Sequence, residues 1–172
     1  MARNINIILI GFMGSGKSAV GHKLAKDLGM DYLDCDELIE KTEKMSINDI
    51  FSKKGEPYFR DLETEIIKTL ADYDNFVFST GGGMVLREEN VKMLKELGPL
   101  VLLWAKPETV YQRVSKETHR PLLNVPDPLA EIKNILDKRT PVYDRVADFK
   151  VDTSKLSIDE CVKGIKEWLR SR

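Results

Sequence analysis

The sequence predicts an α/β protein with three layers, in which a five-stranded parallel sheet is flanked by helices on both faces. Short apolar runs rich in β-branched residues alternate with amphipathic stretches of helical length. Residues 7–10 and 101–104 are apolar at every position. This pattern is typical of strands that are buried on both faces of a parallel sheet.

The expected elements follow one another as repeated strand–helix units. The predicted strands are NINIILIG, MDYLDC, NFVFSTGG, PLVLLWA and DFKVDT. The predicted helices span residues 17–28, 36–44, 46–53, 57–72, 87–96, 107–116, 128–144 and 157–170. Nothing in the 172 residues suggests a second domain, so residues 1–172 are expected to form one domain.

Composition limits the partners that this chain is expected to have. It carries 27 Lys and Arg against 28 Asp and Glu, so no general basic field attracts nucleic acid or an anionic membrane. The longest apolar run, INIILIGFM, is too short to span a bilayer. Cys35 and Cys161 form no zinc-binding or disulfide pattern. We expect a cytoplasmic monomer, with no surplus apolar helix face, no nucleic-acid partner and no membrane partner.

The segment GFMGSGKS, residues 11–18, fits the phosphate-loop motif G-x-x-x-x-G-K-[ST]. A predicted strand precedes it and a predicted helix follows, so backbone N–H groups can surround phosphate at the positive end of a helix. Lys17 is expected to bridge the β- and γ-phosphates of ATP, and Ser18 to hold Mg2+. The predicted ATP-binding residues here are Gly14, Ser15, Gly16, Lys17, Ser18 and Ala19. The alternative is a glycine-rich turn that binds nothing.

The phosphate loop by itself does not specify a kinase. Switch GTPases share it, but they need a base-reading N-K-x-D, and no such run occurs in this sequence. For a chain of this length we therefore expect an ATP-dependent kinase of small molecules.

Two carboxylates, Asp34 and Asp36, follow the second predicted strand. If the chain is still extended there, both project to one side and Cys35 faces the other. Alternatively, either carboxylate caps the next helix, with Glu37 at the spacing of a capping box. Capping explains one of the two carboxylates but not both.

The segment STGGGMV, residues 79–85, contains more glycine than a simple turn needs. This excess favours a close approach of the backbone to a ligand, and the alternative is a tight turn with left-handed residues before the helix at 87. Residues 116–128 contain three prolines, so we expect a mobile loop long enough to act as a lid.

Four arginines lie in or near distinctive segments, and arginine binds carboxylate and phosphate groups in a bidentate manner. They are Arg60, Arg113, Arg120 and Arg139. For any single arginine the alternative is a solvated or salt-bridged surface role.

Six motifs occur together in this order: GFMGSGKS, DCD, GEPYFRDLE, STGGG, RPLL and RTPVY. In order and spacing they resemble those of the shikimate kinase family, from residue 4 to residue 169. The resemblance implies a P-loop fold like that of nucleoside-monophosphate kinases. It also implies transfer of the ATP γ-phosphoryl group to the 3-hydroxyl of shikimate, with Mg2+ as a cofactor.

The resemblance also implies roles for residues of an acceptor-binding region at about 34–61 and beyond it. Asp36 would bind the shikimate hydroxyls and orient or deprotonate the attacking one. Arg60 and Arg139 would clamp the carboxylate. A backbone N–H of the three consecutive glycines would assist them, most closely that of Gly82. These glycines are Gly81, Gly82 and Gly83.

On the ATP side, the resemblance implies that Asp34 supports Mg2+ beside Ser18. Arg120 would close on the ATP phosphates from a mobile lid near residues 113–126, and Arg113 would lie against adenine. The residues expected to act in catalysis are Lys17, Asp36 and Arg120.

Two alternatives to this activity stay open. One is another P-loop kinase, such as a gluconate kinase or a nucleotide kinase. A nucleotide acceptor needs a base pocket and several phosphate-binding arginines, whereas FRDLE and RTPVY suit a single carboxylate better. The other is a regulatory module that binds nucleotide without catalysis, which needs no hydroxyl-orienting acid.

Overall fold

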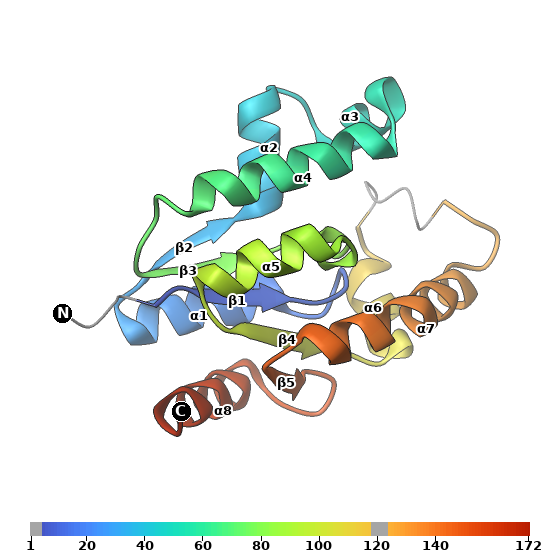
Figure 1. Ribbon diagram of the computed structural model, residues 1–172. Helices are drawn as coiled ribbons and strands as arrows, with labels where there is room; N and C mark the ends of the chain where they lie inside the picture. The colour runs from blue at the N-terminus through green and yellow to red at the C-terminus, as the bar shows by residue number, and fades with distance from the viewer. Residues whose placement is uncertain (1–4, 118–123) are drawn as a thin grey trace.

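A five-stranded parallel sheet forms the centre of the computed structural model, which describes residues 5–117 and 124–172 (Figure 1). The strands are β1 (Ile7–Ile10), β2 (Asp31–Asp34), β3 (Phe76–Ser79), β4 (Leu100–Trp104) and β5 (Phe149–Asp152). They lie in the order β2-β3-β1-β4-β5, and every neighbouring pair is parallel. The predicted fold class and all five predicted strands are confirmed.

Helices connect the strands close to the predicted positions. They are α1 (Lys17–Leu28), α2 (Cys35–Glu43), α3 (Ile47–Lys54), α4 (Glu56–Leu70), α5 (Glu88–Leu97), α6 (Pro107–Val114), α7 (Pro128–Val146) and α8 (Ile158–Arg170). A short 3-10 helix, η1 (Met84–Leu86), was not predicted. The helix predicted at residues 128–144 ends two residues too early. In the structure α7 continues to Val146, whose side chain is buried. Among the described helices, none combines the length and apolarity needed to cross a bilayer.

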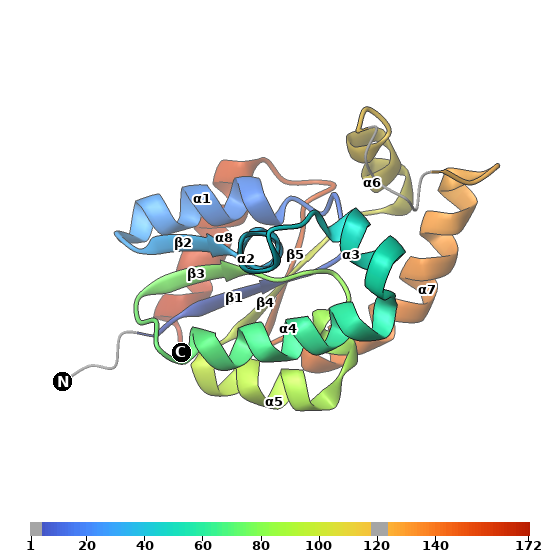
Figure 2. The ribbon, with the colours of Figure 1, turned by 90° about the horizontal axis from the view of Figure 1, so that it is seen from above.

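Both faces of the sheet are covered. Along β1, Ile7 and Leu9 pack into a core with residues of α1 and α8, whereas Ile8 and Ile10 pack into the larger core on the other face. Figure 2 shows α1 on one side of the sheet and α4 and α5 on the other. This alternation confirms that the apolar runs of the sequence are strands with two buried faces.

The parallel arrangement brings the carboxyl ends of all strands to one edge of the sheet, where ligands bind in open α/β sheets. The phosphate loop follows β1, and the glycine-rich segment follows β3. In the register of β2 and β3, Asp34 lies beside Ser79. The predicted site segments therefore lie at the same edge.

Candidate functional site

The phosphate loop connects β1 to α1 through glycines in the left-handed region. Gly14 has φ 69° and Gly16 has φ 96°, which side chains rarely adopt. The Lys17 Nζ donates to the carbonyl of Gly11 at 2.7 Å and to that of Phe12 at 2.9 Å, so the ammonium lies over the loop. No side chain caps the start of α1 within the described residues. The first N–H groups of this helix, including that of Ala19, therefore remain oriented for an anion.

Arg113 and Thr153 hold the phosphate loop in place through hydrogen bonds to its backbone. The Arg113 guanidinium donates from Nη1 to the carbonyl of Gly14 at 3.0 Å and from Nη2 to the carbonyl of Thr153 at 2.8 Å. The Thr153 Oγ1 donates to the carbonyl of Ser15 at 2.7 Å across 138 residues of sequence. Arg113 thus lies within α6 and supports the loop directly, and its contact with adenine stays a prediction.

Arg120, the RPLL motif and the centre of the predicted lid (113–126) lie outside the described residues. The described residues on either side of that gap belong to the turn after α6 and the turn before α7.

Asp34 caps α2. Its Oδ1 accepts from the backbone N–H of Asp36 at 2.8 Å and from that of Glu37 at 3.2 Å. The helix therefore begins at Cys35, so the alternative that one of the two carboxylates caps the helix is confirmed for Asp34, and the alternative of an extended chain that projects Asp34 and Asp36 to one side is wrong. The N-cap ends the strand one residue earlier. Cys35 is fully buried in the core, whereas Asp36 turns toward the glycine-rich segment.

Asp36 is a carboxylate held in an unfavourable environment. Burial raises its pKa from the ordinary value of 3.8 to about 6, the charges of Asp34 and Glu63 add to that effect, and the Lys17 charge opposes it. Its Oδ1 is buried and forms no hydrogen bond within the described residues. An acid kept in this state is typical of a functional site.

The glycines at 81–83 (hereafter the glycine turn) are required by close approach of side chains. A Cβ added to Gly81 would lie 2.8 Å from Asp36 Oδ1 and 2.9 Å from Glu63 Oε1, and one added to Gly83 would collide with the Arg60 guanidinium. None of the three has a φ in the left-handed region. The alternative of a tight left-handed turn is therefore wrong.

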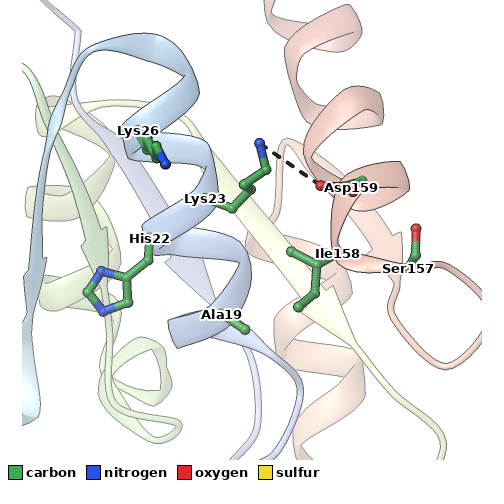
Figure 3. A pocket seen from close by; sticks show the side chains of 7 residues that line it. All are labelled: Ala19, His22, Lys23, Lys26, Ser157, Ile158 and Asp159. Carbon is green, nitrogen blue, oxygen red and sulfur yellow. Dashed lines mark ion pairs between the residues drawn. The ribbon is translucent and has the colours of Figure 1, made fainter.

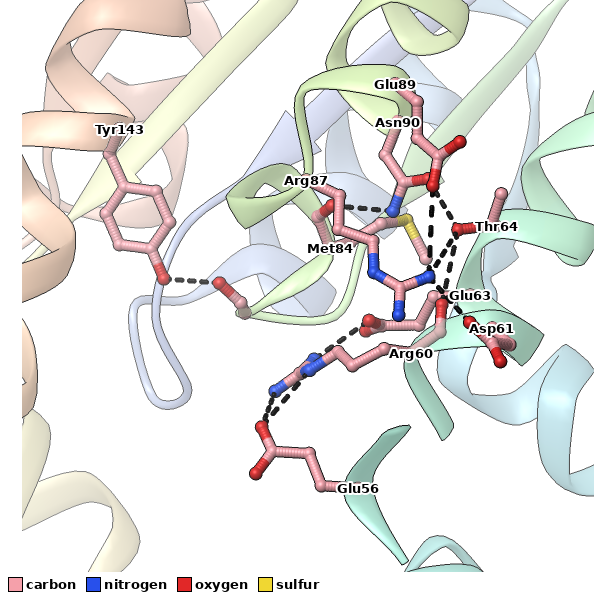
Figure 4. Close-up of polar contacts among 11 residues, drawn as sticks. Glu56, Arg60, Asp61, Glu63, Thr64, Met84, Arg87, Glu89, Asn90 and Tyr143 are labelled. Carbon is pink, nitrogen blue, oxygen red and sulfur yellow. Dashed lines mark hydrogen bonds and ion pairs between the residues drawn. The ribbon is translucent and has the colours of Figure 1, made fainter. Parts of the chain in front are cut away.

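Arg60 and Arg139 reach the glycine turn from different helices. Arg60, on α4, donates from Nη1 to Glu63 Oε2 at 2.8 Å and from Nη2 to Glu56 Oε1 at 3.1 Å (Figure 4). Arg139, on α7, lies over the Phe12 ring, and its Nη1 is 3.3 Å from the place of a Cβ on Gly82. The structure thus brings both predicted arginines to one place.

Glu63 belongs to this cluster and had no predicted role. Its side chain is 1% exposed, and burial raises its pKa while Arg60 and Arg139 lower it. Its Oε1, like Asp36 Oδ1, is buried and unpaired among the described residues. The sequence signal for this role was the position of Glu63 three residues after Arg60 in FRDLE, since residues at this spacing are neighbours on a helix.

The N–H groups of Gly82 and Gly83 complete the cluster. Within residues 5–117 and 124–172 neither forms a hydrogen bond. Two amide groups without a hydrogen-bond partner and two guanidinium groups therefore lie at the glycine turn, and together they could bind a small carboxylate.

Ser18 and Asp34 suit Mg2+, which prefers oxygen ligands and usually needs only one or two protein groups beside phosphate. Burial raises the pKa of Tyr32, nearby Ser18 and Ser79 hydroxyls lower it, and the Asp34 charge raises it. Among the described side chains, no cluster of three His, Cys, Asp or Glu forms a metal cage.

An open depression lies between α1 and α8 (Figure 3). Its lining residues are Ala19, His22, Lys23, Lys26, Ser157, Ile158 and Asp159. Lys23 is paired there with Asp27 and Asp159. The depression is on the opposite side of the sheet from α4, so it belongs to a different surface from the acceptor cluster.

Comparison with known proteins gives consistent matches. The family model described as shikimate kinase matches residues 13–170. A shikimate kinase of Thermodesulfovibrio yellowstonii is 49% identical over 166 residues, covering 96% of this chain and 95% of its own, and one of Pelotomaculum thermopropionicum is 46% identical with the same coverage. A solved shikimate kinase from Acinetobacter baumannii, in complex with shikimate, has a TM-score of 0.92 at 35% identity, covering 97% of this chain and 93% of its own.

Proposed function

The chain belongs to the shikimate kinase family, and from this premise we propose that it transfers the γ-phosphoryl group of ATP to the 3-hydroxyl of shikimate at the edge between the phosphate loop and the glycine turn. The observation that carries the proposal is the convergence of Arg60, Arg139 and Asp36 on that turn. Shikimate is a small anion with three hydroxyls, so it needs cationic donors at one end and an acceptor of hydroxyl protons at the other.

The carboxylate of shikimate would bind at the glycine turn. Arg60 and Arg139 supply guanidinium donors, and Gly82 and Gly83 offer N–H groups that have no partner within the described residues. Together these groups supply hydrogen-bond donors for both carboxylate oxygens. A nucleoside monophosphate would need further cationic groups for its phosphate and a pocket for its base.

Asp36 would accept a hydrogen bond from the attacking hydroxyl. Its unpaired Oδ1 lies at the same glycine turn, and in the ionised state it accepts the hydrogen bond that orients the 3-hydroxyl. As the hydroxyl oxygen bonds to the γ-phosphorus, the bond to the β–γ bridging oxygen breaks, and the hydroxyl proton passes to the carboxylate or to solvent. Phosphoryl transfer depends mainly on this kind of positioning and on charge neutralisation.

The ATP phosphates would occupy the phosphate loop. Lys17 would exchange its contacts with the Gly11 and Phe12 carbonyls for contacts with phosphate oxygens. Ser18 and Asp34 would hold Mg2+, which when bound neutralises charge on those oxygens. Arg113 and Arg120 are proposed to contact adenine and the phosphates, respectively.

The first test is an acceptor screen. With ATP and Mg2+, we expect ADP formation to rise by at least about a hundredfold when shikimate is added, because the positioned hydroxyl supplies the nucleophile. Gluconate and nucleoside monophosphates should give no such rise. As a matched control, Lys17→Met should abolish turnover, whereas Lys26→Met, on the same helix and outside the loop, should not. Equal turnover without shikimate, or turnover only with another acceptor, contradicts the proposal.

A second test is the pH profile. Because the pKa of Asp36 is raised to about 6, the carboxyl becomes neutral as the pH falls through that value and can no longer accept from the hydroxyl. We expect kcat/KM for shikimate to fall about tenfold per pH unit below about 6, as for an essential base in the free enzyme. In Asp36→Asn this limb should disappear. A wild-type profile that stays level down to pH 5 speaks against ionised Asp36 as the acceptor.

A further inference from the structure

All three carbonyls of the glycine turn are held by hydrogen bonds. The Gly81 carbonyl accepts from the Met84 N–H at 3.1 Å, and the Gly83 carbonyl accepts from the Leu86 N–H at 3.1 Å. The Gly82 carbonyl has a distant donor: the Tyr143 hydroxyl, from α7, at 2.6 Å. Tyr143 is fully buried, so its hydroxyl is held firmly in this contact (Figure 4).

Asn90 holds the next residue of the segment. Its side chain is fully buried in α5, and its Nδ2 donates to the Met84 carbonyl at 2.9 Å. Its Oδ1 accepts from the Thr64 hydroxyl at 2.8 Å. Thr64 lies on α4, one helical turn after Arg60, and its hydroxyl is also 3.3 Å from the Arg60 carbonyl. Asn90 therefore joins the glycine turn to the helix that carries Arg60 and Glu63.

These contacts fix the unpaired N–H groups of the turn. In a trans peptide the carbonyl and the following N–H point in opposite directions. The bond from Tyr143 to the Gly82 carbonyl therefore sets the direction of the Gly83 N–H. The bond from Met84 to the Gly81 carbonyl sets that of the Gly82 N–H, and Met84 is itself held by Asn90.

We propose that Tyr143 and Asn90 are positioning residues of the acceptor site, which hold the Gly82 and Gly83 N–H groups in the orientation that binds the substrate carboxylate. Neither has to touch the substrate. Fixing the donors before binding lowers the entropy that binding has to remove. The inference rests on the proposed function, because it assumes that a carboxylate binds at the turn.

The test uses Tyr143→Phe, which removes one oxygen atom, and Asn90→Asp, which keeps the acceptor for Thr64 and removes the donor to Met84. We expect each to raise KM for shikimate about tenfold, the effect of one misplaced hydrogen bond to a charged group. KM for ATP should stay within about twofold, because the phosphate loop keeps its own supports. Amide hydrogen exchange in residues 81–86 should become faster in both variants.

Matched controls at the other end of the sheet separate positioning from loss of stability. Asn6 is a buried Asn that donates to the Tyr73 carbonyl and accepts from the Phe76 N–H. Tyr73 packs its ring against Phe76. Asn6→Asp and Tyr73→Phe are expected to leave KM for shikimate unchanged, although Asn6→Asp lowers Tm.

Three results would overturn the inference: an unchanged KM for shikimate in Tyr143→Phe and Asn90→Asp, an equal rise in both KM values, or the same rise in the control variants. If Asn90→Asp does not fold, Thr64→Val tests the role of Asn90 instead, because this change removes the hydroxyl donor that orients the Asn90 side chain. A wild-type protein that does not phosphorylate shikimate would instead overturn the proposed function, and with it the inference.

Discussion

Asp36→Asn is expected to slow phosphoryl transfer to shikimate by about two to four orders of magnitude, the range for losing a positioned acid or base. The substitution keeps the size of the side chain and removes its charge. The hydroxyl then meets an amide in place of a carboxylate that accepts its hydrogen bond. The measurement is kcat at saturating substrates, together with ATP binding by calorimetry, which should change far less than kcat because the Asp36 carboxylate lies at the glycine turn.

The same substitution should make the unliganded protein more stable. The folded pKa of Asp36, about 6, lies above its ordinary value of 3.8, so the folded state binds this proton more tightly than the unfolded state does. The contribution of Asp36 to the stability of the wild type is therefore lost as the pH rises from about 3.8 through about 6. The gap between these values corresponds to about 2 to 3 kcal/mol, which Asp36→Asn should recover above pH 6.

Urea unfolding at pH 7.5 and pH 5 measures this gain, which should be larger at the higher pH. The matched control is Asp127→Ala. Asp127 caps α7 and is not among the groups that shift the pKa of Asp36, so its loss should destabilise the protein by about 1 kcal/mol. An unchanged rate in Asp36→Asn would show that Asp36 has no part in the chemical step. An equal stability difference at both pH values would contradict the raised pKa of Asp36.

Opposite effects on rate and stability would reflect the composition of the site. Asp36, Glu63 and their unpaired oxygens are buried near one another, which opposes folding until a ligand supplies hydrogen-bond donors. Functional sites commonly carry such an unfavourable arrangement. The rest of the structure, with its two cores on either face of the sheet, provides the stability that tolerates it.

The fold could be predicted because its signals are local. Apolar runs identify the strands, and the phosphate-loop motif lies between a strand and a helix as expected. The order of the strands across the sheet was beyond prediction, since it depends on pairing between distant segments. The start of α2 was misplaced by one residue, and at Asp34 and Asp36 that one residue decides which side chain caps the helix and which faces the site.

The candidate site divides in the same way. Arg60, Arg139 and the glycine turn belong to motifs that can be read along the chain. Tyr143 and Thr153 could not be assigned, because their contacts join residues 61 and 138 positions apart. Asn90 looks like an ordinary polar residue of a helix until its burial is known. Supporting residues of this kind have no spacing rule, so only the three-dimensional contacts identify them.

Arg139→Ala is expected to weaken shikimate binding by about ten- to a hundredfold, which corresponds to losing a hydrogen bond between charged groups. Arg60 is already engaged by Glu56 and Glu63. Arg139, by contrast, forms no ion pair with another described residue, and it faces Gly82, so its guanidinium is the more available partner for the carboxylate.

Arg139 also lies over the ring of Phe12, a residue of the phosphate loop. The variant could therefore act on either substrate, and calorimetry with shikimate and with ATP separates the two. We expect ATP affinity to change less than about twofold, because the loop is held independently by Arg113 and Thr153. A loss of ATP affinity with intact shikimate affinity would instead place Arg139 with the phosphate loop.

Two matched variants of α7 sharpen this comparison. Arg139→Lys keeps the charge but removes the planar pair of donors, so its affinity for shikimate should fall between those of the wild type and Arg139→Ala. Arg145→Ala removes an exposed arginine from the last turn of the same helix and should leave both affinities unchanged. If Arg139→Lys binds shikimate as tightly as the wild type, charge alone suffices at this position and the bidentate clamp is wrong. If Arg145→Ala weakens binding as much as Arg139→Ala, the effect does not come from a contact of Arg139 at the glycine turn.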